Sequence, residues 1–158
     1  MQTILFICTG NTCRSPMAEA IARHWVESPS TGLDPDALFV ASAGLFAAEG
    51  SPVSSETLKS LEKLKIEHRG ASKQVTSEMI HNASIVLCMT NDHRANAIQL
   101  AGGHDDLMQK IILLDPDGDI VDPIGMSQET YDQLASEMME LMPRRLATLC
   151  SPSGGLVT

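Results

Sequence analysis

Short apolar runs alternate along this chain with segments whose apolar residues recur at helical spacing. The runs are too short for helices and are followed by glycine or polar residues, a pattern typical of buried strands in a parallel sheet. We therefore predict four strands, at residues 3–7, 38–43, 85–89 and 110–114.

The segments between these runs predict helices. Behind the first run, Met17, Ile21 and Trp25 share one helical face, with Ser15 as the N-cap and Pro16 at the first helical position. Further helices are predicted at residues 52–64, at 76–82, from a cap at Asn91 to about residue 101, and from Ser127 onward.

The helix that begins near Ser127 is expected to be the last element of the fold, and Pro143 is expected to kink or fray it. One face of this helix is predicted to consist of Tyr131, Leu134, Met138, Leu141 and Arg145.

Strands that alternate with helices predict an α/β fold, with a four-stranded parallel sheet and helices on both faces. The chain of 158 residues is expected to form one domain over residues 1–150, followed by a disordered tail over 151–158. Ligands of such sheets bind beyond the carboxyl ends of the strands, and the first strand ends at Cys8.

Composition narrows the range of partners. The formal net charge of −9 argues against nucleic acid and anionic membranes as general partners, so an anionic substrate would need a local positive site. Because the chain has no apolar run long enough for a membrane span and no recognisable signal peptide, we expect a cytoplasmic protein.

The cysteines and histidines do not follow metal-binding spacings. Cys8, Cys13, Cys88 and Cys150 lack a paired zinc pattern and are expected to be reduced thiols. The five histidines are interpreted as surface residues. We therefore expect neither a metal site nor a cofactor.

The segment from Cys8 to Ser15 reads Cys-Thr-Gly-Asn-Thr-Cys-Arg-Ser and lies between a predicted strand and a predicted helix. Such a turn exposes backbone N–H groups, and the helix N-terminus adds positive potential. Gly10 and Asn11 permit unusual backbone angles there. We therefore expect a phosphate-binding loop, formed by Thr9, Gly10, Asn11, Thr12, Cys13 and Ser15.

Three side chains of this loop suggest a reaction. The positive field favours a thiolate at Cys8, which can attack phosphorus and form a covalent intermediate. The planar fork of Arg14 matches two phosphate oxygens, and Ser15 can donate to the sulfur. The alternative, that Cys8 is simply a small buried residue, is disfavoured by Arg14 and Ser15 at this spacing.

A leaving group must be protonated, which requires a nearby acid. Two Asp-Pro pairs qualify, because Asp115-Pro116 and Asp122-Pro123 both lie in the polar loop before the last helix. Position in the loop alone leaves both candidates open.

The loop sequence resembles the active-site loop of the low-molecular-weight protein tyrosine phosphatases, whose pattern is Cys-x5-Arg-Ser, and the match extends through Pro16-Met17-Ala18-Glu19. The resemblance covers residues 3–149 and implies that family's fold and its cysteinyl-phosphate chemistry. It also implies that Ser42 supports Asn11, and that Asp122 rather than Asp115 is the general acid.

One position departs from the family. Members often carry a supporting histidine four residues before a glutamine, but the residue four before Gln74 is Gly70, with His68 nearby. That support is therefore expected to differ in this chain.

The expected substrate is a phosphorylated protein, and the residues leave its class open. Tyrosine-specific members usually have Ile where this chain has Thr12, and aromatic residues where Ile124 and Gly125 stand. The loop is similar to that of bacterial protein-arginine phosphatases, so we favour phosphoarginine slightly over phosphotyrosine. Leu45, Phe46 and Ile124 are the expected apolar walls; the sequence leaves the oligomeric state undetermined.

Other interpretations are weaker. An arsenate reductase would use the same loop but needs further cysteines, and no second cysteine closely follows Cys88. A non-catalytic phosphate-binding module would leave Cys8 inert. Cys13 either traps oxidised Cys8 as a disulfide or simply packs in the core.

Overall fold

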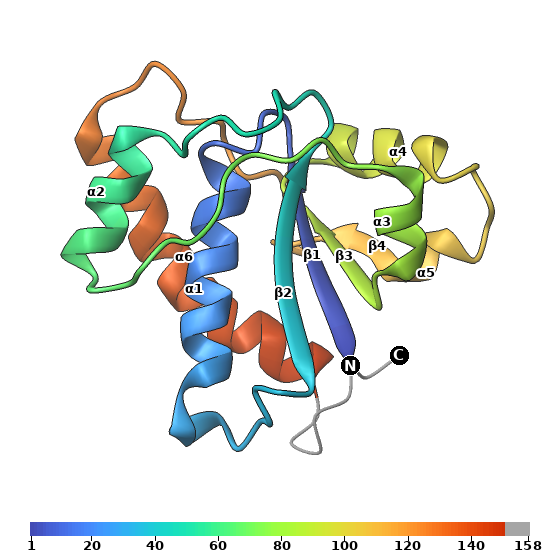
Figure 1. The fold of residues 1–158 in the computed structure, drawn as a ribbon, viewed down its shortest axis with the longest axis horizontal. Coiled ribbons are helices and arrows are strands. Elements are labelled where there is room, and N and C mark those ends of the chain that lie inside the picture. Colours follow the sequence, from blue (N-terminus) through green and yellow to red (C-terminus); the bar gives the residue numbers. More distant parts are fainter. Residues whose placement is uncertain (151–158) are drawn as a thin grey trace.

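The computed structural model describes residues 1–150 (Figure 1), so the tail predicted for 151–158 lies outside the described residues. Its elements are, in chain order, β1 (Gln2–Cys8), α1 (Arg14–Glu27), η1 (Pro29–Thr31), β2 (Leu38–Gly44), α2 (Ser55–Lys63), α3 (Ser77–Asn82), β3 (Ile85–Cys88), α4 (Asn91–Leu100), α5 (Leu107–Lys110), β4 (Ile111–Leu113) and α6 (Gln128–Leu149).

The sheet has the predicted architecture. Its four strands are parallel and lie in the order β2-β1-β3-β4. Helices α1, α2 and α6 cover one face, and α3, α4 and α5 lie on the other (Figure 1). Each face buries its own apolar cluster, the larger between the sheet and α1 with α6. Burial on both faces explains why the strand sequences are continuous apolar runs.

Several helix boundaries differ from the prediction. Helix α1 begins at Arg14, with Cys13 as an N-cap that makes no side-chain capping bond. Ser15 therefore lies inside the helix rather than capping it. Thr90, not Asn91, caps α4 by accepting a hydrogen bond from the backbone N–H of His93.

Two further differences concern the C-terminal half of the chain. The four-residue helix α5 was not predicted, because so short a segment has no periodic signal. Helix α6 continues through Pro143 to Leu149, so the proline does not end it. Of the residues predicted to share one face of this helix, Tyr131, Leu134 and Met138 are buried.

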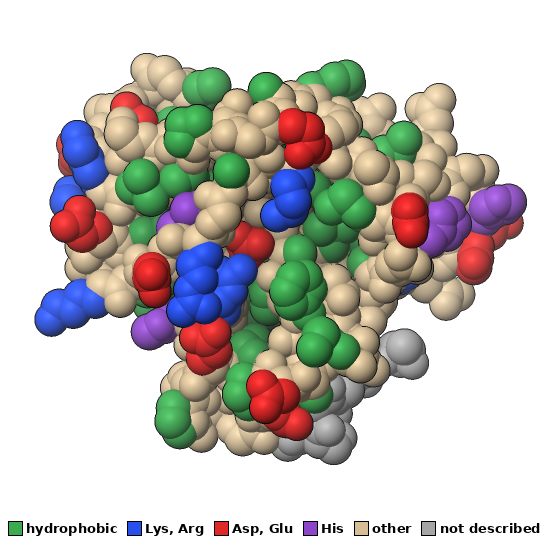
Figure 2. Space-filling view, viewed as in Figure 1, with side chains coloured by type: hydrophobic (Ala, Val, Ile, Leu, Met, Phe, Trp, Pro, Cys, Tyr) green, Lys and Arg blue, Asp and Glu red, His purple; other side chains and the backbone are tan. Residues whose placement is uncertain are grey.

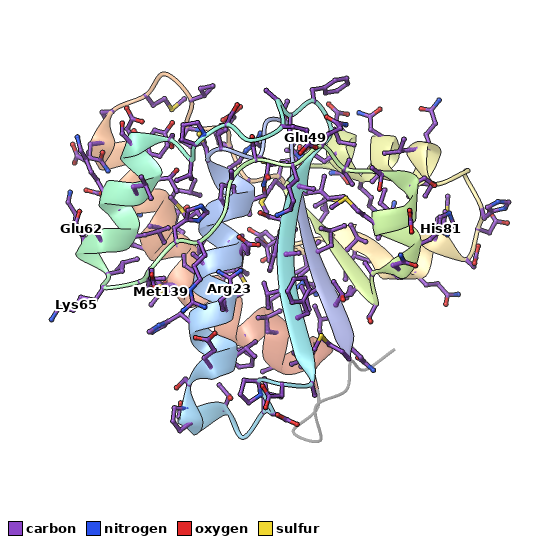
Figure 3. The ribbon with its side chains drawn as sticks, in the orientation of Figure 1. Arg23, Glu49, Glu62, Lys65, His81 and Met139 are labelled. Carbon is purple, nitrogen blue, oxygen red and sulfur yellow. The ribbon has the colours of Figure 1, made fainter. Side chains whose placement is uncertain are left out.

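A buried ion pair links α1 to β2. Glu19 is 4% exposed, and its carboxylate lies 3.3 Å from Arg23, which also donates to the Val40 carbonyl. Figure 3 shows Arg23 projecting from α1 on the side of β2. Burial raises the pKa of the Glu19 carboxyl, and the nearby Arg23 opposes that rise.

The chain after β2 lies against the loop that follows β1. The backbone N–H groups of Leu45 and Phe46 donate to the carbonyls of Cys8 and Thr9, at 3.0 and 2.9 Å. Glu49, at the carboxyl end of β2 in Figure 3, accepts a hydrogen bond from the backbone of Gln74. These bonds fix two chain segments around the end of β1.

Gly44 permits this close approach. A Cβ atom at this position would lie 2.5 Å from the Thr9 carbonyl oxygen and 2.9 Å from the Asn11 nitrogen. Both neighbours are backbone atoms, so they cannot rotate away as a side chain would.

Among the described residues, no helix has the length and apolar character needed to cross a membrane.

Gly44→Ala should therefore destabilise the protein. We expect a loss of about 1–3 kcal/mol in the free energy of unfolding, as for other overpacked sites. Gly10→Ala is the matched control, because its Cβ would meet only Thr12 Oγ1 at 3.7 Å. Urea unfolding of both variants measures the difference, and equal losses would contradict the steric explanation.

Candidate functional site

The loop between β1 and α1 lies at the carboxyl edge of the sheet. The chain segments after β2 and before α6 lie at the same edge (Figure 1). The predicted site residues therefore come from three separate parts of the sequence, and the parallel sheet brings them together.

Cys8 ends β1 with a buried thiol. Its Sγ lies 2.9 Å from the hydroxyl oxygen of Ser15. That oxygen also accepts a hydrogen bond from the Asn11 side-chain amide at 2.8 Å. Because Asn11 supplies an N–H to this oxygen, the Ser15 hydroxyl proton is free to be donated to the sulfur. The second residue of α1 thus serves the thiol, which explains why Ser15 is not a cap.

Asn11 holds the loop in shape. Its φ of 55° is left-handed, and its side chain is almost fully buried. The amide N–H groups donate to Ser15 and to Ser42 at 2.8 and 2.9 Å, and its oxygen accepts the backbone N–H of Lys73 at 2.9 Å. Every polar atom of this buried side chain has a partner.

The structure refines two expectations for this part of the loop. Of Gly10 and Asn11, both of which permit unusual backbone angles, it is Asn11 that adopts the left-handed conformation. His68 bonds to the Gly70 carbonyl, and the backbone of Lys73, rather than a histidine, supports Asn11.

Arg14 is 4% exposed and lies between the loop and the segment before α6. Its Nη1 donates to the Ile120 carbonyl at 3.0 Å. Its Nη2 lies 3.4 Å from an Asp122 carboxylate oxygen and 3.5 Å from the Thr9 hydroxyl. The guanidinium is therefore held in place before any anion binds, which reduces the entropy lost on binding.

The two Asp-Pro pairs have different surroundings. Asp122 approaches Arg14, keeps 43% of its side chain exposed, and accepts a hydrogen bond from the Ile124 backbone. Asp115 instead accepts a hydrogen bond from the backbone N–H of Asp117 and forms a local turn. Only Asp122 combines exposure to solvent with a contact to the loop.

His93 is a site residue that the sequence analysis missed. It was interpreted as a surface residue, but it is 6% exposed, and its Nε2 lies 2.8 Å from the Thr9 hydroxyl. Burial, followed by the charge of Arg14, lowers the pKa of His93 to about 4. The available signal was its position in the first turn after β3, at the same sheet edge as Cys8.

Thr12 and Cys13 face different surroundings. The Thr12 side chain is half-buried, and its carbonyl accepts the backbone N–H of Ser54. Cys13 Sγ lies 3.4 Å from the Tyr131 hydroxyl on α6, and burial raises the pKa of that tyrosine. All four cysteines are free. A disulfide between Cys13 and oxidised Cys8 stays a prediction.

The expected apolar walls differ in exposure. Phe46 and Ile124 are 77% and 68% exposed, whereas Leu45 is 8% exposed and packs in the apolar cluster on the α3 side. Leu45 therefore presents little surface to a substrate. Its carbonyl instead accepts a hydrogen bond from Gln74, which braces the turn after β2.

The electrostatic character of the site is local. Figure 2 shows acidic and basic side chains interspersed over the viewed face rather than gathered by sign. The buried Arg14 and the N-terminus of α1 supply positive potential at the loop. Residues 1–150 contain no group of three or more His, Cys, Asp and Glu side chains placed to hold a metal ion.

Comparisons with known proteins agree on the relationship. The sequence profile described as "Low molecular weight phosphotyrosine protein phosphatase" matches residues 3–151. A protein-arginine-phosphatase of Bacillus subtilis is 34% identical over 146 residues, which are 91% of this chain and 93% of the relative. A low molecular weight protein-tyrosine-phosphatase, PtpB of Staphylococcus haemolyticus, is 34% identical over 88% of this chain and 94% of its own.

A solved structure extends this likeness to three dimensions. A cysteine-to-serine mutant of an arginine phosphatase, with a phosphorylated active-site serine, superposes with a TM-score of 0.82 at 34% identity. The match covers 92% of this chain and 93% of that one.

Acidification should destabilise the fold through His93. Its pKa is about 4 in the folded state against an ordinary 6.5, so the unfolded chain binds an extra proton between these values. The free energy of unfolding should fall as the pH drops through this window, by up to about 1.4 kcal/mol per pH unit. Urea titrations at a series of pH values measure this slope.

His93→Asn should flatten that pH dependence, while His24→Asn, at an exposed position, should leave it unchanged. An unaltered slope in the His93 variant would show that another group titrates.

Proposed function

The chain belongs to the low molecular weight phosphotyrosine protein phosphatase family and is a protein phosphatase. From this premise, we propose that Cys8, Arg14 and Asp122 carry out its reaction. We further propose that phosphoarginine is the preferred substrate. The observation that carries the proposal is the convergence of these groups. Cys8 lies 2.9 Å from the Ser15 hydroxyl, and Arg14 connects the same loop to Asp122.

In the first step, the Cys8 thiolate attacks phosphorus and an S–P bond forms. The bond from phosphorus to the leaving oxygen or nitrogen breaks, and that atom takes the proton of Asp122. Arg14 binds two of the phosphoryl oxygens, and the N–H groups of the loop bind the developing negative charge.

In the second step, a water molecule attacks the cysteinyl-phosphate. Asp122, now ionised, accepts a proton from the water, the S–P bond breaks and inorganic phosphate forms. The Ser15 hydroxyl donates to the departing thiolate. Asn11 fixes Ser15 by an N–H bond of 2.8 Å, so that hydroxyl is oriented toward the sulfur in both steps.

The phosphoarginine preference rests on Thr12 and on the acid loop. Thr12 offers a hydroxyl where tyrosine-specific members usually offer an apolar isoleucine. Ile124 and Gly125 supply no aromatic ring beside Asp122. The Bacillus subtilis relative named for arginine dephosphorylation supports the same preference.

Phosphotyrosine is the second candidate. Phe46 is 77% exposed at the turn after β2, and such a ring can stack on a phenol. The Staphylococcus relative named for tyrosine dephosphorylation also supports this alternative.

An arsenate reductase fits less well. Such an enzyme passes oxidation along reactive thiols, but burial raises the pKa of Cys88 to about 12 and that of Cys150 to about 11. Thiols of this kind stay protonated and react slowly.

The remaining parts of the proposal concern the whole chain. We propose one catalytic domain over residues 1–150, with a phosphorylated protein rather than nucleic acid as partner, in keeping with the net charge of −9. The free thiols of Cys8, Cys13, Cys88 and Cys150 support a cytoplasmic location.

Asp122→Asn should slow hydrolysis of substrates with poor leaving groups by roughly 10²–10⁴ in kcat, and activated aryl phosphates less. Asp115→Asn is the matched control and should lose much less. Cys8→Ser defines zero turnover. Steady-state kinetics on both substrate classes test the assignment, and a larger loss in the Asp115 variant would make that residue the acid.

Thr12→Ile should shift preference from phosphoarginine toward phosphotyrosine, because isoleucine cannot accept a substrate N–H. The measurement is kcat/KM on two peptides that differ only in the phosphorylated residue. We expect the ratio to fall by about tenfold or more. Thr12→Ser is the control that keeps the hydroxyl. If the ratio stays the same in Thr12→Ile, Thr12 plays no part in specificity.

A further inference from the structure

Besides Thr12, the loop carries a hydroxyl at Thr9, which lies beside Arg14, the residue proposed to bind the phosphoryl oxygens. Thr9 is exposed at the mouth of the loop, and its oxygen lies 3.5 Å from Nη2 of Arg14. On its other side, Nε2 of His93 lies 2.8 Å away. The exposed Thr9 side chain is thus held by contacts with the buried His93 and with the cationic Arg14.

His93 is built into the fold at this position. It is 6% exposed, and its backbone N–H donates to the Thr90 hydroxyl that caps α4. Its Nδ1 is buried and has no hydrogen-bond partner. Because the ring has one polar partner, the contact with Thr9 fixes its orientation.

The ring is neutral at physiological pH. Burial and the Arg14 cation disfavour imidazolium, against the weaker opposite effect of Asp122, Asp119 and Asp92. A neutral imidazole has one N–H and one lone pair. Since Arg14 is positively charged and lies one hydroxyl away, electrostatics favour the tautomer that turns the Nε2 lone pair toward Thr9, at the cost of a buried Nδ1–H without an acceptor.

This tautomer determines what Thr9 can do. In this tautomer the Thr9 hydroxyl donates its hydrogen bond to Nε2, and Arg14 donates to one lone pair of the hydroxyl oxygen. The second lone pair is left facing solvent at the mouth of the loop, so the hydroxyl can accept a hydrogen bond from a ligand but cannot donate one.

We propose that Thr9 and His93 form a specificity pair in which the Thr9 oxygen accepts an N–H from the guanidinium of phosphoarginine. The inference rests on the proposed function, and it adds a residue pair to the specificity proposed for Thr12. The leaving group of phosphotyrosine carries no N–H for this oxygen. The Thr9 oxygen also gives the cationic guanidinium leaving group a hydrogen-bond acceptor close to Arg14, which carries the same charge.

The test compares threonine variants on matched phosphoarginine and phosphotyrosine peptides. Thr9→Val keeps the shape of the side chain and removes the acceptor, and it should lower the phosphoarginine-to-phosphotyrosine ratio of kcat/KM by about tenfold or more. Thr9→Ser should restore most of the ratio. Thr148→Val, an exposed threonine on α6, is the control for the substitution itself.

The histidine is tested through the same ratio. His93→Leu removes the group that holds the hydroxyl proton, so the ratio should fall, while His93→Gln, whose side-chain carbonyl can accept that proton, should retain more of it. The double variant Thr9→Val/His93→Leu should lose little more than Thr9→Val alone, because the two residues act as a unit. Thermal unfolding of each variant shows whether a changed kcat/KM ratio comes from a loss of stability instead.

The outcomes separate the two proposals. If wild-type enzyme prefers phosphoarginine but Thr9→Val lowers both rates equally, the specificity pair is wrong and the proposed function stands. If wild-type enzyme prefers phosphotyrosine, the proposed preference is wrong, and the pair is still supported only if Thr9→Val selectively lowers the remaining phosphoarginine rate. Additive losses in the double variant overturn the coupling.

Discussion

The buried side chain of Asn11 is the interaction on which the site depends. A left-handed residue between a strand and a helix is strained for most side chains, and asparagine tolerates it best after glycine. Its amide then bonds to α1 through Ser15, to β2 through Ser42 and to the following connection through Lys73. These bonds are made in a buried site, where an unpaired amide group would cost about 1–3 kcal/mol. One residue thereby fixes the loop against two elements of the fold.

The same arrangement sets the chemistry of the thiol. Because Asn11 occupies the acceptor side of Ser15, the hydroxyl proton has Cys8 as its partner, and the loop holds a donor for sulfur without a metal or a second base. Arg14 is fixed in a similar manner by the Ile120 carbonyl and by Asp122. The groups that would bind an anion are therefore ordered in its absence, a condition for strong electrostatic stabilisation of a transition state.

Close packing around the loop carries a structural constraint. Gly44 lets the end of β2 approach the backbone of the loop to within contact distance. His93, which contacts Thr9 in the loop, comes from α4, a helix distant in the sequence. The parallel sheet makes this possible, since all its strands end at one edge.

Much of the fold was readable from the sequence. Buried parallel strands leave continuous apolar runs, and all four were predicted to within a few residues. The candidate loop was also predictable, because Cys8, Arg14 and Ser15 are local to one another, and the structure places the Cys8 sulfur 2.9 Å from the Ser15 hydroxyl. Predictions failed at two helix starts: Thr90 rather than Asn91 caps α4, and Ser15 lies inside α1, where its hydroxyl contacts Cys8 and Asn11.

The sequence by itself thus determined the fold class, which depends on local patterns, and it predicted an anion-binding loop and a nucleophile from residues within one short segment. Only the tertiary structure showed that Asp122 contacts Arg14, that the Lys73 backbone bonds to Asn11, and that His93 is buried beside Thr9. The physical reason is common to all three. Each depends on contacts between residues some sixty or more positions apart, and no local periodicity or propensity records which distant side chain will fill a given space.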